Sequence, residues 1–114
     1  MTTAIAILFL ALAALSVITI ALAAAGSLGR NRFIGIRTAA TLSSDDAWKR
    51  AHRAGLLPAG VGAFICALLA VIAIVLVQTH GSEPLAEVTV GCSIAAILVG
   101  GVWSTIRASR HATP

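Results

Sequence analysis

The chain has 114 residues, of which 59% are apolar and only 11% charged. Soluble domains have about half apolar and a quarter charged residues, so the composition indicates a membrane protein and argues against an ordinary soluble domain. The net charge of +4 would suggest a nucleic-acid partner in a soluble protein. Here the basic residues flank apolar segments, where they set topology, and we expect no direct nucleic-acid binding.

The first apolar run, residues 4–25, contains no Asp, Glu, Lys or Arg. As a helix it spans roughly 30 Å, which matches the hydrocarbon layer of a bilayer. The small residues of ALAAAG at 21–26 also suit a signal peptidase, so a cleaved signal peptide is the alternative. No Lys or Arg precedes the run, and it is longer than a signal-peptide core, so we expect a retained transmembrane helix.

The signature loop, residues 26–55, follows and holds every basic residue except Arg107 and Arg110. Near its start, Phe33, Ile34 and Ile36 alternate with basic and small residues. A fully solvated loop would not favour these side chains, so we expect the segment to lie in the membrane interface or against the helices. Gly35 permits a turn or a backbone approach that a Cβ would block.

Residues 43–53, SSDDAWKRAHR, predict a short amphipathic helix on the membrane surface. Ser43 is its expected N-cap and Gly55 its expected end, with Pro58 beginning the next helix. Asp45 and Lys49, one turn apart, are expected to form a weak ion pair. Helical spacing separates an apolar side, Ala47, Trp48 and Ala51, from a basic side, Lys49, Arg50 and Arg53.

Two further charge-free runs, residues 56–77 and 88–106, predict the second and third membrane helices. Small residues every four positions in the third run, Cys92, Ala96, Gly100 and Ser104, predict close helix packing. Cys66 and Cys92 are expected to be buried free thiols. We therefore predict an all-α fold of three transmembrane helices in one membrane domain.

The loops predict the orientation of the chain. Residues 78–87 contain Glu83 and Glu87 but no Lys or Arg, in contrast to the basic signature loop and C-terminus. Cytoplasmic loops collect Lys and Arg, so we expect the signature loop and the C-terminus inside, and the N-terminus and outer loop outside.

Catalytic chemistry finds little support in the sequence. The histidines are scattered, and Asp45 and Asp46 are adjacent, so on a helix they point about 100° apart, which does not suit a paired acid and base. No metal spacing such as CxxC occurs, and no ionisable residue reaches the middle of a span, as a pump usually requires. We expect neither an enzyme nor a lone transporter, with no cofactor and no metal.

One pattern in the signature loop resembles a known family. Asn31, GIRT at residues 35–38, Thr41, Ser44, Trp48 and HR at residues 52–53 are similar to the signature loop of the SdpI family of bacterial membrane proteins. Members of that family pair this loop with flanking transmembrane helices. The resemblance implies a multi-pass protein of the bacterial plasma membrane.

The resemblance also implies a function. The founding member confers immunity to a secreted peptide toxin and holds a transcriptional repressor at the membrane; founding-type proteins have further helices before the loop, whereas this chain has the three-helix unit. We expect immunity to a membrane-active peptide, signal relay through the cytoplasmic loop, or both. The alternative is a small accessory subunit of a larger plasma-membrane complex. Expected partners are the lipid bilayer, a membrane protein, a peptide toxin or a regulator, and a second copy of the chain.

Arg37 is the first candidate in the loop, because its guanidinium can clamp the loop through a carboxylate such as Asp45 or Asp46, or bind a lipid phosphate or a partner. Trp48 is expected to anchor in the interface. His52 can stack on Trp48, bind a loop carbonyl or sense pH. The predicted partner-binding or lipid-binding residues are Asn31, Gly35, Arg37, Thr38, Ser44, Trp48, His52 and Arg53.

Overall fold

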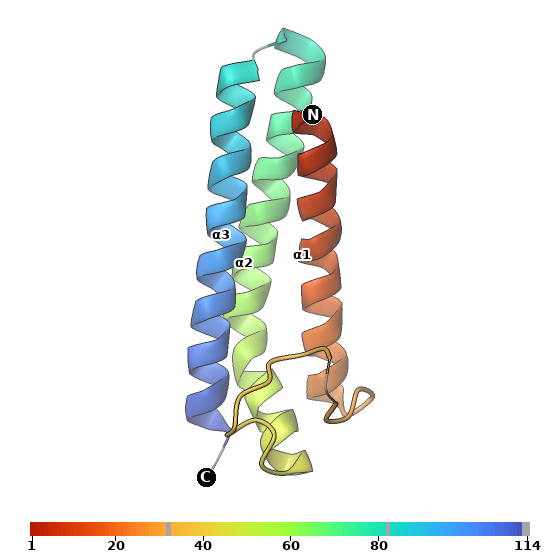
Figure 1. Ribbon diagram of the computed structural model, residues 1–114, viewed down its shortest axis with the longest axis vertical. Helices are drawn as coiled ribbons and strands as arrows, with labels where there is room; N and C mark the ends of the chain where they lie inside the picture. Colours follow the sequence, from red (N-terminus) through yellow and green to blue (C-terminus); the bar gives the residue numbers. More distant parts are fainter. Residues whose placement is uncertain (32, 82, 113–114) are drawn as a thin grey trace.

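The computed structural model describes residues 1–31, 33–81 and 83–112. Within this part the chain forms three helices and no strand: α1 (Thr2–Ala25), α2 (Asp45–His80) and α3 (Glu83–His111). They run side by side in an elongated bundle of 51 × 21 × 18 Å (Figure 1). Each is long and apolar enough to cross a membrane. The predicted all-α fold is therefore confirmed, with three helices long and apolar enough to span a membrane.

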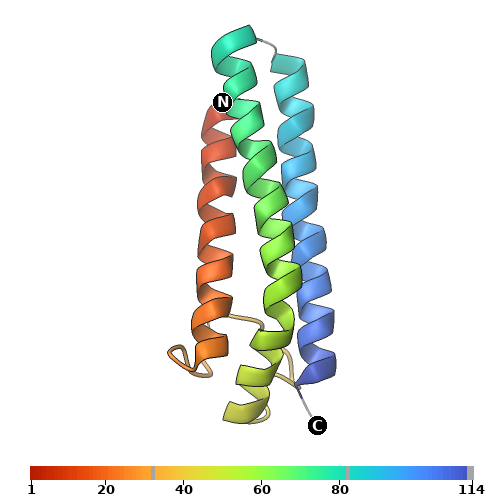
Figure 2. The same cartoon turned by 180° about the vertical axis from the view of Figure 1, so that it is seen from behind.

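Helix α2 is the central element of the bundle. It packs along both α1 and α3, which contact each other far less (Figures 1 and 2). Residues 26–44, which we call the first connection, lie at the same end as the C-terminus, and we call this the loop end. The N-terminus and the turn at Gly81 lie at the opposite, N-terminal end (Figure 2). There the Thr2 hydroxyl donates to Glu83 Oε2 at 2.9 Å and joins α1 to α3.

The structure has no break between a surface helix and the second span, because α2 continues through Gly55 and Pro58 for 36 residues. With 36 residues it is longer than the hydrocarbon layer, which about 20 helical residues span. We assign the charge-free residues 56–77 to the bilayer, so the first turns of α2 project beyond it. Gly55 serves packing instead of ending the helix, since a Cβ there would lie 2.7 Å from Ser104 Oγ and 2.9 Å from Ile36 Cδ1.

Small residues bring α2 and α3 together, as the spacing predicts. Gly62 and Gly100 face each other so closely that a Cβ on either would lie 2.8 Å from the other's Cα. Ser104 is buried, but Cys92 is exposed, so its predicted burial is wrong. Cys66 is buried as expected, and Ser93 of α3 donates to its carbonyl at 3.0 Å.

Both ends of the first connection are fixed by helix caps. Gly26 adopts the left-handed conformation with φ 87° and donates its N–H to the Ala23 carbonyl, which ends α1. Ser44 is extended, and its hydroxyl accepts from the Ala47 N–H at 3.0 Å, which begins α2. The N-cap is thus Ser44 instead of Ser43, because the Ser43 hydroxyl donates to the Ala40 carbonyl.

Candidate functional site

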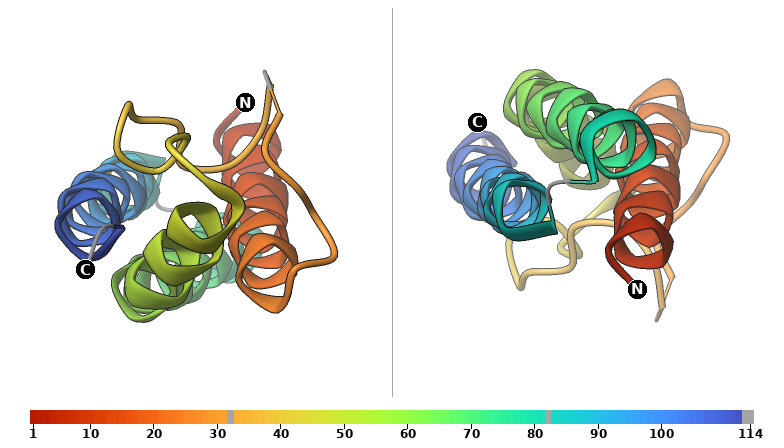
Figure 3. Two further views of the ribbon diagram at one scale, coloured as in Figure 1. Left: turned by 90° about the horizontal axis from the view of Figure 1, so that it is seen from below. Right: turned by 90° about the horizontal axis from the view of Figure 1, so that it is seen from above.

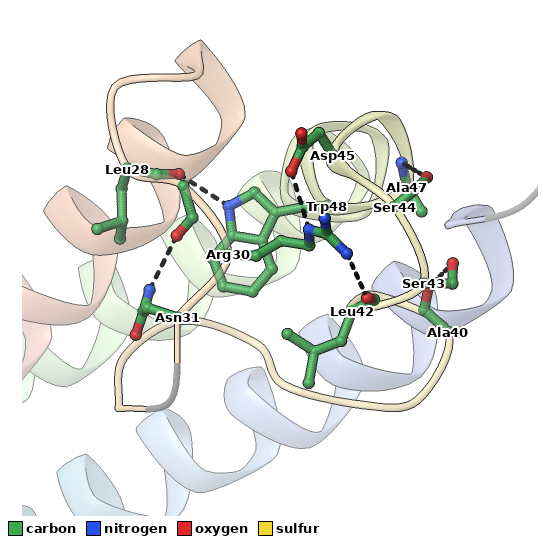
Figure 4. Close-up of polar contacts among 11 residues, drawn as sticks. Leu28, Arg30, Asn31, Ala40, Leu42, Ser43, Ser44, Asp45, Ala47 and Trp48 are labelled. Carbon is green, nitrogen blue, oxygen red and sulfur yellow. Dashed lines mark hydrogen bonds and ion pairs between the residues drawn. The ribbon is translucent and has the colours of Figure 1, made fainter.

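The first connection crosses between α1 and α3 on the side of the bundle away from α2 (Figure 3). Asn31 shapes its first half, because Oδ1 accepts from the N–H groups of Phe33 and Ile34 at 2.9 and 2.8 Å. Its Nδ2 donates to the Gly29 carbonyl at 2.9 Å (Figure 4). A side chain that binds the backbone two and three residues onward forms a tight turn without help from a partner.

Gly35 and Ile36 bring the connection against α2. Gly35 has φ 100°, a conformation that only glycine adopts readily. A Cβ at this position would lie 2.7 Å from Trp48 Cη2 and 3.0 Å from His52 Nε2. Ile36 is 8% exposed. The expectation that the segment lies against the helices, with Gly35 allowing a close approach, is confirmed for these two residues.

Trp48 lies beneath the connection instead of at the membrane surface. It is 1% exposed, and its indole N–H donates to the Leu28 carbonyl at 2.8 Å (Figure 4). The predicted interfacial anchor is therefore wrong. The helical pattern correctly placed Trp48 on the apolar side with Ala47 and Ala51, but that side is covered by the chain's own connection instead of by lipid.

The His52 ring contacts the Trp48 ring, with centroids 4.2 Å apart and the ring planes tilted by 46° instead of stacked. Its Nε2 accepts from the Ile36 N–H at 2.9 Å, so Nε2 carries no proton. Nδ1 then carries the proton and donates to the Trp48 carbonyl at 2.7 Å. Both ring nitrogens are satisfied in the neutral form alone. His52 precedes the segment assigned to the bilayer, and burial lowers its pKa from 6.5.

Two threonines hold the second half of the connection. Thr41 is fully buried, accepts from the Thr38 N–H at 2.9 Å and donates to the Ile36 carbonyl at 2.8 Å. The Thr38 hydroxyl lies 3.0 Å from the Ser109 hydroxyl and links the connection to α3. Thr41 is absent from the predicted site, although two threonines three residues apart are a signal for such a turn.

Basic side chains donate hydrogen bonds to carbonyl groups at the helix ends. Arg53 donates from Nε to the Ala24 carbonyl of α1 at 3.2 Å, and Arg50 donates to the Ala112 carbonyl after α3 at 2.8 Å. Such cations satisfy carbonyls that have no partner within their own helix. Arg50 therefore makes a structural contact near the end of the chain. The sequence pattern predicts only that Arg50 lies on the basic side of a surface helix.

Asp45 pairs with a residue of the connection instead of with Lys49. Arg30 donates from Nε to Asp45 Oδ1 at 2.8 Å and from Nη1 to the Leu42 carbonyl at 3.0 Å (Figure 4). The carboxylate is 79% exposed, so this pair adds little stability by itself. It does fasten the start of the connection to the start of α2.

The Arg37 side chain is exposed, as is that of Arg53, and each donates one hydrogen bond from Nε. The Arg37 Nε donates to the Asn31 carbonyl at 3.1 Å, which is a clamp within the connection. In the described part of the chain the two terminal nitrogens make no further hydrogen bond, and neither Asp45 nor Asp46 pairs with them. Phe33 and Ile34, at 87% and 49% exposed, belong to the same connection.

The comparison with protein families matches residues 27–107 to the SdpI/YfhL protein family. The chain belongs to the SdpI/YfhL family. The matched segment contains the first connection except Gly26, all of α2 and most of α3. Neither the comparison with curated proteins nor that with solved structures found a match.

All eight predicted site residues lie within residues 27–107, the segment that matches the SdpI/YfhL family. The structure brings most of them together around one contact, the connection against the first turns of α2. Gly35, Thr38, Ser44, Trp48 and His52 contact the chain's own backbone or rings there. Their role in binding a lipid or a partner stays a prediction.

Proposed function

We propose that this SdpI/YfhL family protein gives immunity to a membrane-active peptide, or relays the presence of such a peptide, through the first connection. The observation that carries the proposal is that Phe33, Ile34 and Arg37 are each exposed on a connection held from beneath. Apolar side chains beside a cation suit a peptide or a regulator at a membrane surface. His52 and Thr41 supply the rigid support.

The proposal places the loop end on the cytoplasmic side of a bacterial plasma membrane. Support comes from the cations gathered there, including Arg30, Arg37 and Arg110, while the turn between α2 and α3 is followed by Glu83 and Glu87. Positive residues favour the cytoplasmic side. In this orientation the connection faces cytoplasmic regulators and the inner leaflet.

A growth assay tests the proposal. Cells that lack the chromosomal gene are given the wild-type chain, Arg37→Gln or Arg110→Gln, and are challenged with purified membrane-permeabilising peptides. The wild type is expected to raise the peptide concentration that stops growth, and Arg37→Gln to reduce this protection several-fold, since it removes an exposed cation with one internal bond. Arg110→Gln removes the same charge from the exposed end of α3 and is expected to keep full protection.

Two outcomes would contradict the proposal. Equal sensitivity of cells with and without the gene, for every peptide tested, would rule out the immunity function. Equal protection by the Arg37→Gln and Arg110→Gln chains would rule out a role for Arg37. Purification in mild detergent tests the alternative of an accessory subunit. A second membrane protein recovered at fixed stoichiometry would favour that alternative, whereas the chain recovered alone or with its own copies favours immunity or relay.

A further inference from the structure

A cavity of about 290 Å³ lies between α1 and α3, next to the first connection. Leu12 to Ile20 of α1 form one wall, Ile97 to Thr105 of α3 the other, and Ala59 and Ala63 of α2 lie at the back. Ile34, Gly35 and Ile36 close it toward the loop end. The cavity exists because α1 and α3 both pack on α2 but contact each other little.

The shape of this cavity restricts what can enter. The hydrogen bond between Thr2 and Glu83 joins α1 and α3 at the N-terminal end, and the connection closes the loop end. The wall on α1, from Leu12 to Ile20, is about 12 Å long. A ligand therefore enters sideways between α1 and α3, within the apolar spans. A transmembrane helix, about 10 Å across with its side chains, is too large to fit. A single flexible chain fits.

The lining selects a neutral ligand with one hydrogen-bond acceptor. No ionisable side chain is among the described residues that line the cavity. Three of its four hydroxyl groups donate to carbonyls: Ser16 to Leu12, Ser104 to Gly55 and Thr105 to Gly101, at 2.8, 2.8 and 2.9 Å. Thr19 also lines the cavity, and within the described part of the chain its hydroxyl makes no hydrogen bond.

We propose that this cavity binds one neutral single-chain lipid, an alkyl ester whose carbonyl oxygen accepts from the Thr19 hydroxyl. Thr19 lies six residues before the end of α1 at Ala25, about 9 Å along the helix axis. The ester oxygens of a phospholipid stay near its headgroup, too shallow for this depth, whereas a neutral single-chain ester can sink to it. The proposal does not rest on the proposed function.

The natural fluorophore Trp48 offers a readout of occupancy. It contacts the other side of Gly35, which closes the cavity toward the loop end. The full chain carrying Trp103→Phe, which removes the exposed tryptophan, is placed in nanodiscs of phosphatidylcholine and titrated with bromoethyl decanoate. The bromine lies next to the ester and quenches nearby indole fluorescence. We expect quenching of Trp48 that saturates.

Two pairs of variants locate the binding. Gly101→Leu fills the cavity, and nothing lies within 4 Å of a Cβ at Gly101, so the fold is expected to tolerate it; Gly91→Leu makes the same change on α3 away from the cavity. Gly101→Leu should abolish saturable quenching and Gly91→Leu should keep it. Thr19→Val should weaken apparent affinity about three- to tenfold through the lost hydrogen bond, and Ser16→Ala should not, because the Ser16 hydroxyl is already bonded.

Three results would overturn the proposal. Quenching that rises linearly and is equal in Gly101→Leu and Gly91→Leu would mean that the probe only partitions into the bilayer. Equal affinities of the Thr19→Val and Ser16→Ala chains for the ester would rule out the proposed hydrogen bond from Thr19. Quenching by phosphatidylcholine brominated on its acyl chains, lost in Gly101→Leu and unaffected by the ester, would mean that a phospholipid chain fills the cavity instead.

Discussion

At the scale of single residues, His52 couples two parts of the chain that are 16 positions apart. Its Nε2 holds the Ile36 N–H of the connection, and its Nδ1–H holds the Trp48 carbonyl of α2. A protonated ring can keep the second bond but not the first, because Nε2–H would then face the Ile36 N–H. The neutral form is therefore part of the folded connection.

His52 makes stability depend on pH. Burial lowers its pKa in the folded chain below 6.5, so between the folded pKa and 6.5 the unfolded chain binds more protons. The stabilisation is complete above pH 6.5 and is lost as the pH falls toward the folded pKa. The thermal unfolding midpoint of the chain in detergent is measured between pH 5 and pH 8. We expect this midpoint to fall by several degrees as the pH drops below about 6.5.

Two substitutions separate this effect from other titrations. His52→Gln should give a lower midpoint that no longer depends on pH in this range. His111 lies exposed at the end of α3, so His111→Gln should retain the wild-type profile. A profile for His52→Gln that still falls in parallel with the wild type would show that another group carries the dependence.

Residue patterns predicted some of these contacts and missed others for a physical reason. The need for glycine at position 35 follows from local chain geometry, and the structure confirms the close approach. Trp48 was placed at the membrane surface because spacing shows which side of a helix is apolar but not what covers it. Arg50 binds the Ala112 carbonyl after α3, and Arg53 binds the Ala24 carbonyl of α1, across 62 and 29 positions. No local pattern contains these contacts.

At the scale of elements, tertiary contacts override local helix signals in α2. Gly55 and Pro58 mark a break by local rules, yet α2 continues through both. Gly55 lies against Ser104 and Ile36, and Ser104 donates to its carbonyl. A glycine is needed at position 55 because Ser104 of α3 and Ile36 of the connection leave no room for a Cβ. It does not mark the end of a helix.

The contact between Gly62 and Gly100 predicts how α2 and α3 respond to a single methyl group. Gly62→Ala puts a Cβ 2.8 Å from the Gly100 Cα and 3.1 Å from the Ala96 carbonyl, and backbone cannot move aside as a flexible side chain can. We expect a loss of about 1–3 kcal/mol in the free energy of unfolding, the usual range for overpacking. Unfolding by a denaturing detergent, followed by tryptophan fluorescence, measures it.

Gly60 provides the matched control on the same helix. A Cβ there has nothing within 4 Å, so Gly60→Ala is expected to be neutral or to stabilise slightly, since alanine favours a helix more than glycine does. Equal losses for the two variants would mean that the contact between α2 and α3 does not determine the effect, since helix propensity alone favours alanine at both positions.

At the scale of the whole molecule, hydropathy was sufficient to predict three helices able to cross a membrane, because each span must be long and free of charge. The signature pattern was sufficient for the family, since the match covers residues 27–107. The cavity could not be predicted. It depends on α1 and α3 packing on α2 more than on each other, which no segment of sequence specifies alone.

The proposed orientation predicts which sites a membrane-impermeant maleimide reaches. In a Cys92→Ala background, Thr79→Cys is expected to be labelled in intact cells, and Phe33→Cys only after the cells are permeabilised. Both positions are exposed, and they lie near opposite ends of α2 and the bundle. Buried Cys66 remains as an internal thiol that should not react. Labelling of Phe33→Cys in intact cells would reverse the orientation.

The hydroxyl groups of α3 have a consequence for how the protein is made. Ser93 and Ser104 donate to the Cys66 and Gly55 carbonyls of α2. The two helices are close neighbours in the chain, since α2 ends at His80 and α3 begins at Glu83. In hydrocarbon, such contacts favour two helices that stay together. We expect α2 and α3 to leave the ribosome and enter the bilayer as a paired hairpin, against which the earlier-made α1 docks.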